Sequence, residues 1–542
     1  MKFRFTVIAA AIACCLSCVD ANDQLGESLI PVDQMYSIYS ETVPLSSVRM
    51  QMADSLSGYS NSRITIGAVR DDVYGLSTRA CALTLVPISD SLDFGENPVA
   101  TNFHFEAAHD TTSFCDPAQK RILQNVNVYA LTKPLVASKN FDCNAVIEHS
   151  ENTITKGTPV INGKDSLSFD FTQEFANRYL SITQDDLKSL DKYLEKVPGI
   201  YIDTDAPTGK GGRIDMFQLQ LGFDTQYYTL KGNYARLTVR TKYKHWKERK
   251  DTSFFFYFSP LSLTRLDSLI TKNSQGNLPQ YALNLTAHET RHMAGEASDK
   301  VYVEGGGGLK PVITARQIKD LASELISAKG GDPKSAVINK ATIVLPFEFP
   351  EDYKEMDKFP YILSPTCRIK NDTTATFMGL TDASSSNENQ GDIDRSNLQF
   401  TPDITYHMQE ILKMDDKKID SGNYDIWLLI MANEIVKTQS NTSSNDMSEY
   451  YQYLAYQNYY NNMYGGYGGY GGYGGYGGYG NYYSNYYSYM MMAAYAGGNS
   501  GSTTTTTAAL DKDRYYSGYL NGPAADRAPQ LKITFSVPNT AK

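Results

Sequence analysis

The segment from His288 to His292 has the residue types of a zinc-dependent hydrolase. It reads His-Glu-Thr-Arg-His, which matches the pattern H-E-x-x-H. On a helix, His288 and His292 would lie one turn apart on one face and could both bind zinc, while Glu289 would act as the general base. A pattern with three fixed positions recurs by chance, so a zinc metallopeptidase is a remote hypothesis for this chain.

The residues around this pattern favour a strand over a helix. Apolar side chains alternate through residues 281–287, and in a strand positions i and i+4 do not form the helical ligand pair. Gly295 fits the longer metzincin pattern, but Ser298 stands where that pattern has its third histidine. Arg291 places a cation between the two histidines, and Glu304 could act as a third ligand although no pattern selects it.

Two glycine-rich segments lack the features of a phosphate-binding loop. Gly305 to Gly308 precede an expected helix, but the P-loop pattern and the alternation of a parallel sheet are absent. Glycine there is expected to allow a tight turn or a close approach of the backbone, and Gly209 to Gly212 are expected to form a surface turn. The other histidines have no recognisable catalytic flanks. They are His104, His109, His149, His245 and His407. We therefore expect no enzymatic activity, and assign no catalytic, metal-binding or cofactor-binding residue.

Short β-branched and aromatic segments separated by turn residues dominate the sequence that must position any site. Many alternate apolar with polar residues, as half-buried antiparallel strands do. Examples are residues 63–66, 82–86, 127–131, 166–171, 217–221, 235–242, 253–258, 342–345, 425–436 and 531–537. Three helices are expected, over residues 183–197, 315–328 and 404–413. The fold class predicted is mainly β, with two tandem jelly-roll-like β-sandwiches and a few short helices.

A long Tyr/Gly-rich segment interrupts this pattern. Gly-Gly-Tyr repeats run from Tyr464 to Tyr479, and a threonine run covers Thr503 to Thr507. No periodicity there could bury a core, so disorder is expected. Because a good strand follows at 531–537, we interpret the segment as an insertion that projects from one hairpin of the second sandwich. Tyrosine with glycine suits either a spacer or a contact surface.

Strand–helix segments at 167–180 and 398–412 resemble each other, which suggests two related sandwiches divided near residues 197–199. The expected domains are a signal peptide at 1–17, a lipidated tether at 18–33 and an N-terminal sandwich at 34–198. A C-terminal sandwich is expected at 199–447 together with 528–542, interrupted by a low-complexity insertion at 448–527.

The first residues resemble a bacterial lipoprotein signal. Lys2 and Arg4 precede an apolar run too short to span a bilayer, which takes about 20 residues, and Leu16-Ser17-Cys18 is similar to a lipobox. Cys14 and Cys15 are rival acceptors, but the polar residues after Cys18 favour that residue as the lipidated N-terminus.

A net charge of −10 argues against nucleic acid as a partner. The remaining cysteines are Cys81, Cys115, Cys143 and Cys367, for which a Cys115–Cys143 disulfide and separate thiols are equally expected.

Four segments resemble a family of Bacteroidota outer-membrane lipoproteins known as domain of unknown function 4270. They are the mature start at residues 18–31, the Gly67–Gly75 segment with Asp72 where proline is usual, the Gly-rich Tyr302–Leu309 segment and the C-terminal residues 529–535. The resemblance implies a lipoprotein of the outer membrane, exposed at the cell surface, built of jelly-roll-like sandwiches and without assigned catalytic residues.

These observations favour a non-enzymatic surface lipoprotein, anchored through Cys18, that acts as a binding or scaffold subunit of an outer-membrane protein assembly. The partners expected are the membrane itself and one or more outer-membrane proteins. The alternative is a glycan-binding lipoprotein of a nutrient-uptake system, which would present a row of exposed aromatic side chains on one sandwich face.

Overall fold

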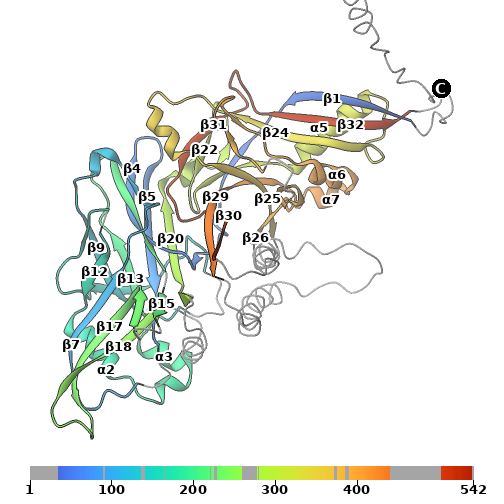
Figure 1. Ribbon diagram of the computed structural model, residues 1–542. Helices are drawn as coiled ribbons and strands as arrows, with labels where there is room; N and C mark the ends of the chain where they lie inside the picture. The colour runs from blue at the N-terminus through green and yellow to red at the C-terminus, as the bar shows by residue number, and fades with distance from the viewer. Residues whose placement is uncertain are drawn as a thin grey trace, which may run out of the picture.

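The chain forms a mainly β structure with a few short helices, and every strand pairing in its described part is antiparallel (Figure 1). The computed structural model describes residues 35–88, 92–135, 141–163, 165–219, 221–224, 229–258, 277–278, 280–370, 375–384, 390–439 and 502–539. The predicted fold class is confirmed. Cys14, Cys15 and Cys18 lie outside the described residues.

A first body packs two large sheets against each other. One sheet consists of β10 (His149–Thr153), β9 (Gln124–Leu131), β13 (Ile200–Thr204), β5 (Gly75–Leu83), β4 (Arg63–Asp71), β14 (Gly211–Gln218) and β8 (Phe114–Cys115), with β11 (Val160–Ile161), β20 (Ala282–His288) and β3 (Tyr59–Ser60) at its edges. The other consists of β12 (Leu167–Asp170), β7 (Glu96–Ala107), β17 (Tyr234–Lys242), β18 (Lys250–Phe258) and β6 (Leu85–Pro87). A small sheet of β16 (Thr229–Gly232), β15 (Leu221–Asp224) and β19 (Asn277–Leu278) accompanies them.

The first core forms because alternate residues of these strands face inward. In β17, Ala235, Leu237 and Val239 are buried while the residues between them are more exposed. Phe103 of β7 contacts four other aromatic rings in this core, with centroid separations of 4.7–6.0 Å. Such aromatic pairs add to the free energy gained by burying apolar area.

A second body forms around a separate core. Its first sheet has the order β1 (Tyr36–Pro44), β32 (Gln530–Pro538), β24 (Val337–Pro346), β28 (Gln399–Phe400) and β27 (Ile393–Asp394). Its second has the order β21 (Gly295–Glu296), β2 (Arg49–Met52), β23 (Leu309–Ile313), β29 (Ile426–Gln439), β25 (Ile362–Lys370) and β26 (Ala375–Gly379), with β30 (Ser502–Leu510) also paired to β29. β22 (Lys300–Glu304) and β31 (Ser517–Asn521) form a two-stranded sheet beside them.

The helices lie against these sheets, and several of them begin at side-chain caps. Thr314 accepts a hydrogen bond from the Gln317 N–H and so caps α5 (Ala315–Ala328), which covers the predicted residues. The expected helix at 183–197 is instead split at Ser189 into a short 3₁₀ turn and α3, because the Ser189 side chain caps a new helix there. These two are η4 (Asp186–Lys188) and α3 (Leu190–Lys196). The remaining α-helices are α2 (Gln173–Leu180), α6 (Thr405–Lys413) and α7 (Asp416–Ile419). The remaining 3₁₀ helices are η3 (Pro117–Gln119), η5 (Glu289–Met293), η6 (Tyr353–Lys358) and η7 (Thr381–Ser384).

The predicted domain boundary at residues 198–199 does not separate the two cores. The first core contains residues from Ile64 to Ala282, so it continues 83 residues beyond Gly199 (282 − 199). The second core contains Leu45, Val48, Met50 and Met52 and then residues 301–537. The start of the chain, which was assigned to the N-terminal sandwich, therefore belongs to the second body, where β1 pairs with β32 along nine positions. Pairing partners far apart in the sequence decide this division.

The Tyr/Gly-rich segment is inserted in a hairpin, as predicted, but its boundaries differ. β29 and β30 pair from Met431↔Leu510 to Gln439↔Ser502, so the residues on either side of the segment 440–501 lie opposite each other. The threonine run forms part of β30, and the residues after it include β31 with Ser517 buried. Residues 502–527 of the predicted low-complexity insertion are thus part of the folded body. Residues 440–501 lie outside the described residues.

The four cysteines of the described chain are free thiols, so no Cys115–Cys143 disulfide forms. Cys81, Cys143 and Cys367 are buried and Cys115 is half-buried. Among the described helices, none has the length and apolar character needed to cross a membrane.

Candidate functional site: a buried polar junction

His288, the first residue of the zinc-protease pattern, lies where the two bodies meet, in a cluster of buried polar and charged side chains that we call the buried junction. Its members come from β5 and β20 of the first body, from β22 and β23 of the second, and from the segment between β30 and β31. They are Arg79, His288, Glu304, Lys310, Lys512 and Asp513.

His288 is the last residue of β20 and points into the junction. It has extended backbone angles and pairs with Ser77 of β5. Its side chain is 2% exposed, and its Nδ1 lies 3.1 Å from Glu304 Oε1 and 3.3 Å from Ser77 Oγ. Burial lowers the pKa of the imidazole, so His288 is neutral at pH 7.

The rest of the pattern points elsewhere. His292 lies in the 3₁₀ helix η5, is exposed, and its Nδ1 lies 2.8 Å from the Glu289 carbonyl oxygen. Glu289 accepts a hydrogen bond from the Leu76 N–H, and Arg291 forms two hydrogen bonds with Asp54. The two imidazoles therefore do not converge on one point. No group of three or more His, Cys, Asp or Glu side chains in the described residues is arranged to hold a metal ion.

Glu304, at the end of β22, is the acceptor at the centre of the junction. Its carboxylate receives hydrogen bonds from Thr290 Oγ1 and from the Leu309 N–H, in addition to the contact with His288. Burial alone would raise the pKa of this carboxyl, but these partners outweigh burial and hold the pKa below its ordinary value. Glu304 is therefore an anion with its hydrogen bonds satisfied by protein groups.

Lys310 of β23 holds the glycine-rich turn in place. Its Nζ donates to the carbonyl oxygens of Glu304, Gly306 and Gly308, the last two at 2.9 and 3.1 Å. Burial lowers the pKa of Lys310 to about 7, and the nearby Glu304 charge offsets only part of that effect. The ammonium replaces water as the partner of three carbonyl groups that a buried turn would otherwise leave unsatisfied.

The glycines from Gly305 to Gly308 allow the two bodies to approach closely. A Cβ on Gly307 would lie 2.7 Å from Cys143 Sγ, and one on Gly305 would lie 2.6 Å from the Arg514 carbonyl oxygen. Gly306 has φ +56, which favours glycine. The Gly307 carbonyl accepts a hydrogen bond from the Ala53 N–H. The expectation of a tight turn with close backbone contact is confirmed.

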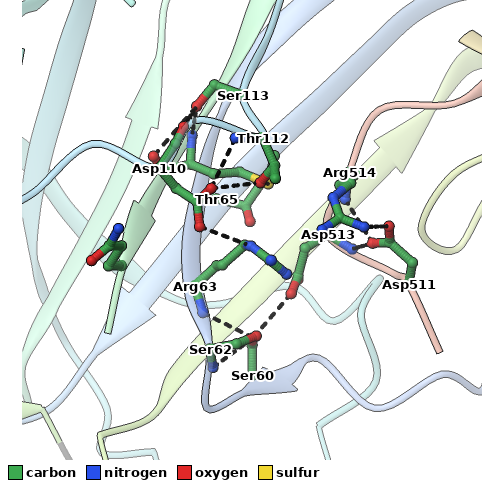
Figure 2. Close-up of polar contacts among 12 residues, drawn as sticks. Ser60, Ser62, Arg63, Thr65, Asp110, Thr112, Ser113, Asp511, Asp513 and Arg514 are labelled. Atoms are coloured by element: carbon green, nitrogen blue, oxygen red, sulfur yellow. Dashed lines mark hydrogen bonds and ion pairs between the residues drawn. The ribbon is translucent and has the colours of Figure 1, made fainter. Parts of the chain in front are cut away.

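The segment from Asp511 to Arg514 attaches the end of β30 to the first body (Figure 2). Asp513 accepts hydrogen bonds from Ser60 Oγ at 3.0 Å and from Asn284 Nδ2 at 2.9 Å. Lys512 Nζ donates to the carbonyl oxygens of Ser57 and Tyr59. Burial raises the pKa of Asp513 and lowers that of Lys512, so each residue needs the other's charge nearby.

Two ion pairs flank this attachment. Arg63 Nε lies 3.0 Å from Asp110 Oδ2, and Arg514 Nη1 lies 3.0 Å from Asp511 Oδ2, as Figure 2 shows. Asp511 also accepts a hydrogen bond from the Tyr516 hydroxyl at 2.8 Å. These contacts fix the direction in which the chain enters β31.

Arg79 lies between the sheets of the junction and is 2% exposed. Its Nη1 donates to Ser77 Oγ and to the Thr78 carbonyl oxygen, both at 3.0 Å, whereas Nε and Nη2 have no hydrogen-bond partner among the described residues. Burial lowers the pKa of the guanidinium, and Glu304 and Asp513 contribute compensating negative charge. The guanidinium is held by the charges around it as much as by hydrogen bonds.

The junction connects the two bodies and is closed to solvent. Its histidine, carboxylates and lysines are hydrogen-bonded to protein groups that belong to both bodies. Breaking such a buried pair by removing one partner is strongly destabilising, because it leaves an uncompensated charge or donor. The arrangement can fix how the bodies sit together; nothing in it exposes a nucleophile or a base to a substrate.

Sequence reasoning named His288 and Glu304 but missed the other members of the junction. Lys310 stands inside the apolar strand Leu309–Ile313, where a charged residue is unexpected and could have been noticed. Lys512 and Asp513 were assigned to the low-complexity insertion, and Arg79 has no local signal at all. The surface turn expected at Gly209 to Gly212 is right only for its first half. Gly209 is exposed, with no atom within 4 Å of a Cβ built on it, whereas Gly211 and Gly212 are buried and begin β14.

The turn between β4 and β5 meets β22 and β31 beside the junction. Tyr74, in the turn between β4 and β5, packs edge-on against Tyr302 of β22 with ring centroids 5.6 Å apart. The Tyr74 hydroxyl donates a hydrogen bond to the Gly518 carbonyl oxygen of β31. No family model, curated protein or solved structure matches this chain.

Proposed function

We propose that this chain is a non-enzymatic surface lipoprotein, anchored to the outer membrane through Cys18, that serves as a binding subunit of an outer-membrane protein assembly. The observation that supports the proposal is the β29–β30 hairpin, whose last paired residues, Gln439 and Ser502, flank the Tyr/Gly-rich sequence. The residues just after β30 are attached to the first body through Lys512 and Asp513. Tyrosine with glycine is a composition suited to contact with another protein, and the hairpin would join that sequence to the folded body.

The arrangement of the junction supports a binding role over catalysis. The side chains of the H-E-x-x-H pattern serve three separate contacts, with Glu304, with Leu76 and with Asp54. A subunit that holds two bodies in a fixed relation suits the role of a scaffold, since contacts on both bodies are then presented in one geometry.

Affinity purification of the tagged full chain from gently solubilised membranes tests the proposal. The wild-type chain is compared with a variant in which the tyrosines from Tyr464 to Tyr479 are replaced by serine, which leaves β29 and β30 unchanged. We expect the same outer-membrane protein to accompany the wild-type chain and to be lost with the variant. Recovery of the wild-type chain alone would overturn the proposal.

A glycan-binding role is the second candidate, and exposed aromatic side chains favour it. Phe349, Tyr353 and Tyr361 are 56%, 68% and 47% exposed and lie in a single connection, the one between β24 and β25. Aromatic rings in such positions suit stacking on sugar faces. A panel of polysaccharides tests this candidate: binding that Tyr353→Ala abolishes would support it, and no binding to any member would exclude it.

A further inference from the structure

The outward face of the sheet β1–β32–β24 has an apolar corner at the start of β1. In this register Ile38 lies opposite Ser536, which lies opposite Val337, while Tyr36 lies opposite Pro538. Tyr36, Ile38 and Val337 are 53%, 68% and 44% exposed. Because Ser536 between them is small, the two aliphatic side chains stand out from the sheet on either side of it. We call Tyr36, Ile38 and Val337 the apolar corner.

The same face becomes polar and then basic along the strands. The next row has Ser40 opposite Thr534, followed by Lys340 of β24, and the row after it has Thr42 opposite Lys532. Lys340 is paired with the buried Asp403 at 2.7 Å, whereas Lys532 is exposed. Glu41 lies on the other face, where it pairs with Lys329 at 2.8 Å. These outward rows therefore place no exposed carboxylate beside the apolar corner.

The corner is also the point at which the N-terminal segment joins the folded body. The Asn539 N–H donates to the Met35 carbonyl oxygen at 2.8 Å, and Ser37 Oγ donates to Asn539 Oδ1 at 2.6 Å, so the start of β1 is tied to the end of β32. Met35 follows Cys18 by 17 residues (35 − 18), a length that spans at most about 60 Å of extended chain. A lipid at Cys18 would therefore tether the body to the bilayer at this corner.

We propose that the apolar corner docks into the interfacial layer of the membrane that holds the anchor. This inference rests on the lipid anchor proposed above. Tyr36 has the amphipathic ring that is enriched at membrane interfaces, and Ile38 and Val337 supply apolar area to bury there. Lys532 lies on the same face, in a position to contact phosphate headgroups. Three side chains alone bind weakly, but the anchor makes their contact intramolecular and so raises its effective concentration.

Lipid-dependent fluorescence quenching tests this docking. The lipidated full chain carries Cys115→Ser and Ser40→Cys, and a fluorophore is attached at position 40. It is reconstituted in vesicles of phosphatidylethanolamine and phosphatidylglycerol, in which a spin-labelled lipid is the quencher. A matched reporter at Thr101→Cys lies on an exposed position of β7 in the first body. We expect quenching at position 40 and none at position 101. We also expect Ile38→Glu to abolish it, and Val99→Glu, at a site 52% exposed in β7, to leave it unchanged.

Equal quenching at both reporters, or quenching that survives Ile38→Glu, would overturn the docking. So would a fluorophore at position 40 that is shielded from aqueous iodide before lipid is added, because another segment or a second copy of the chain would then cover the corner. Mass spectrometry of Cys18 separately tests the anchor. The same quenching measured on a Cys18→Ser chain, held on nickel-chelating lipids through an N-terminal histidine tag, tests the corner whether or not Cys18 is lipidated.

Discussion

At the scale of single residues, two histidines four positions apart have opposite environments. His288 ends a strand and is buried against Glu304, whereas His292 lies in a 3₁₀ helix and faces solvent. The cause is the change from strand to 3₁₀ helix immediately after His288, which turns the two side chains in different directions. A pattern that is catalytic on a continuous helix becomes a structural contact here.

The two histidines should therefore differ in their effect on stability. His288→Ala removes a buried ring and a partner of Glu304, and we expect it to lower the free energy of unfolding by about 2–4 kcal/mol. His292→Ala changes an exposed side chain and should alter that free energy by no more than about 0.5 kcal/mol. Denaturant unfolding of both variants measures the difference, and equal effects would contradict the assigned environments.

The lowered pKa of Glu304 predicts a pH-dependent contribution to stability. Its folded-state pKa lies below the ordinary value of 4.5, so the ionised carboxylate stabilises the fold above pH 4.5 and loses this contribution as the pH falls through the folded-state pKa. Glu304→Gln should cost about 2–4 kcal/mol at pH 7. The gap between wild type and variant should narrow in acid. A gap that stays constant from pH 7 to pH 3 would show that the carboxylate is not the stabilising species.

At the scale of elements, the glycine-rich turn between β22 and β23 determines how closely the two bodies approach. Lys310 satisfies two carbonyls of the turn, and Cys143 of the first body lies against Gly307. The turn serves as a contact surface made of backbone, which only glycine makes possible at this distance.

A methyl group at this contact should be costly. Gly307→Ala places a Cβ 2.7 Å from the Cys143 sulfur, and we expect it to lower the free energy of unfolding by about 1–3 kcal/mol. Gly209→Ala is the matched control, since its Cβ meets open space, and should be neutral or stabilising by up to about 1 kcal/mol. If thermal unfolding shows the two variants to be equally stable, the close approach at Gly307 does not hold the bodies together.

At the scale of the whole molecule, two hydrophobic cores are joined by charges. Within the described chain, the segment from Ser57 to His288 builds the first body, and the segments on either side of it build the second. Lys512 and Asp513 attach the second body to the edge strand β3 and to β20 of the first. Buried charged groups that bind across two surfaces in this way specify one arrangement of those surfaces more than they add stability.

Removing one of these charges should loosen the junction without unfolding either core. In Lys512→Met, the Ser57 and Tyr59 carbonyls lose their donor, and we expect amide hydrogen exchange in β3 and β20 to accelerate about tenfold. Exchange in strands β7 and β17 of the first core should be unchanged. Lys417→Met, at an exposed position of α7, should have no effect on either set. Uniform acceleration in all four strands would mean that the bodies unfold as one unit.

Local patterns predicted what depends on near neighbours. Helix α5 begins and ends at the predicted residues because its apolar spacing lies within its own fourteen residues and its cap, Thr314, comes directly before them. The boundary at residues 198–199 was wrong because strand β13, which follows it, pairs with β5 and β9 far earlier in the chain. Lys512 was missed since its partners, the Ser57 and Tyr59 carbonyls, are more than 450 residues away.

The sequence by itself determined the mainly β class, the position of the Tyr/Gly-rich insertion in a hairpin and the turn at the four glycines, because alternation, composition and turn residues are local signals. Only the tertiary structure decided which strands share a core, that His288 faces Glu304, and that an exposed apolar corner lies where the N-terminal segment joins the body. The shared cores and the apolar corner depend on pairing between residues up to hundreds of positions apart, and the contact of His288 with Glu304 depends on how two separate strands meet, neither of which a local pattern encodes.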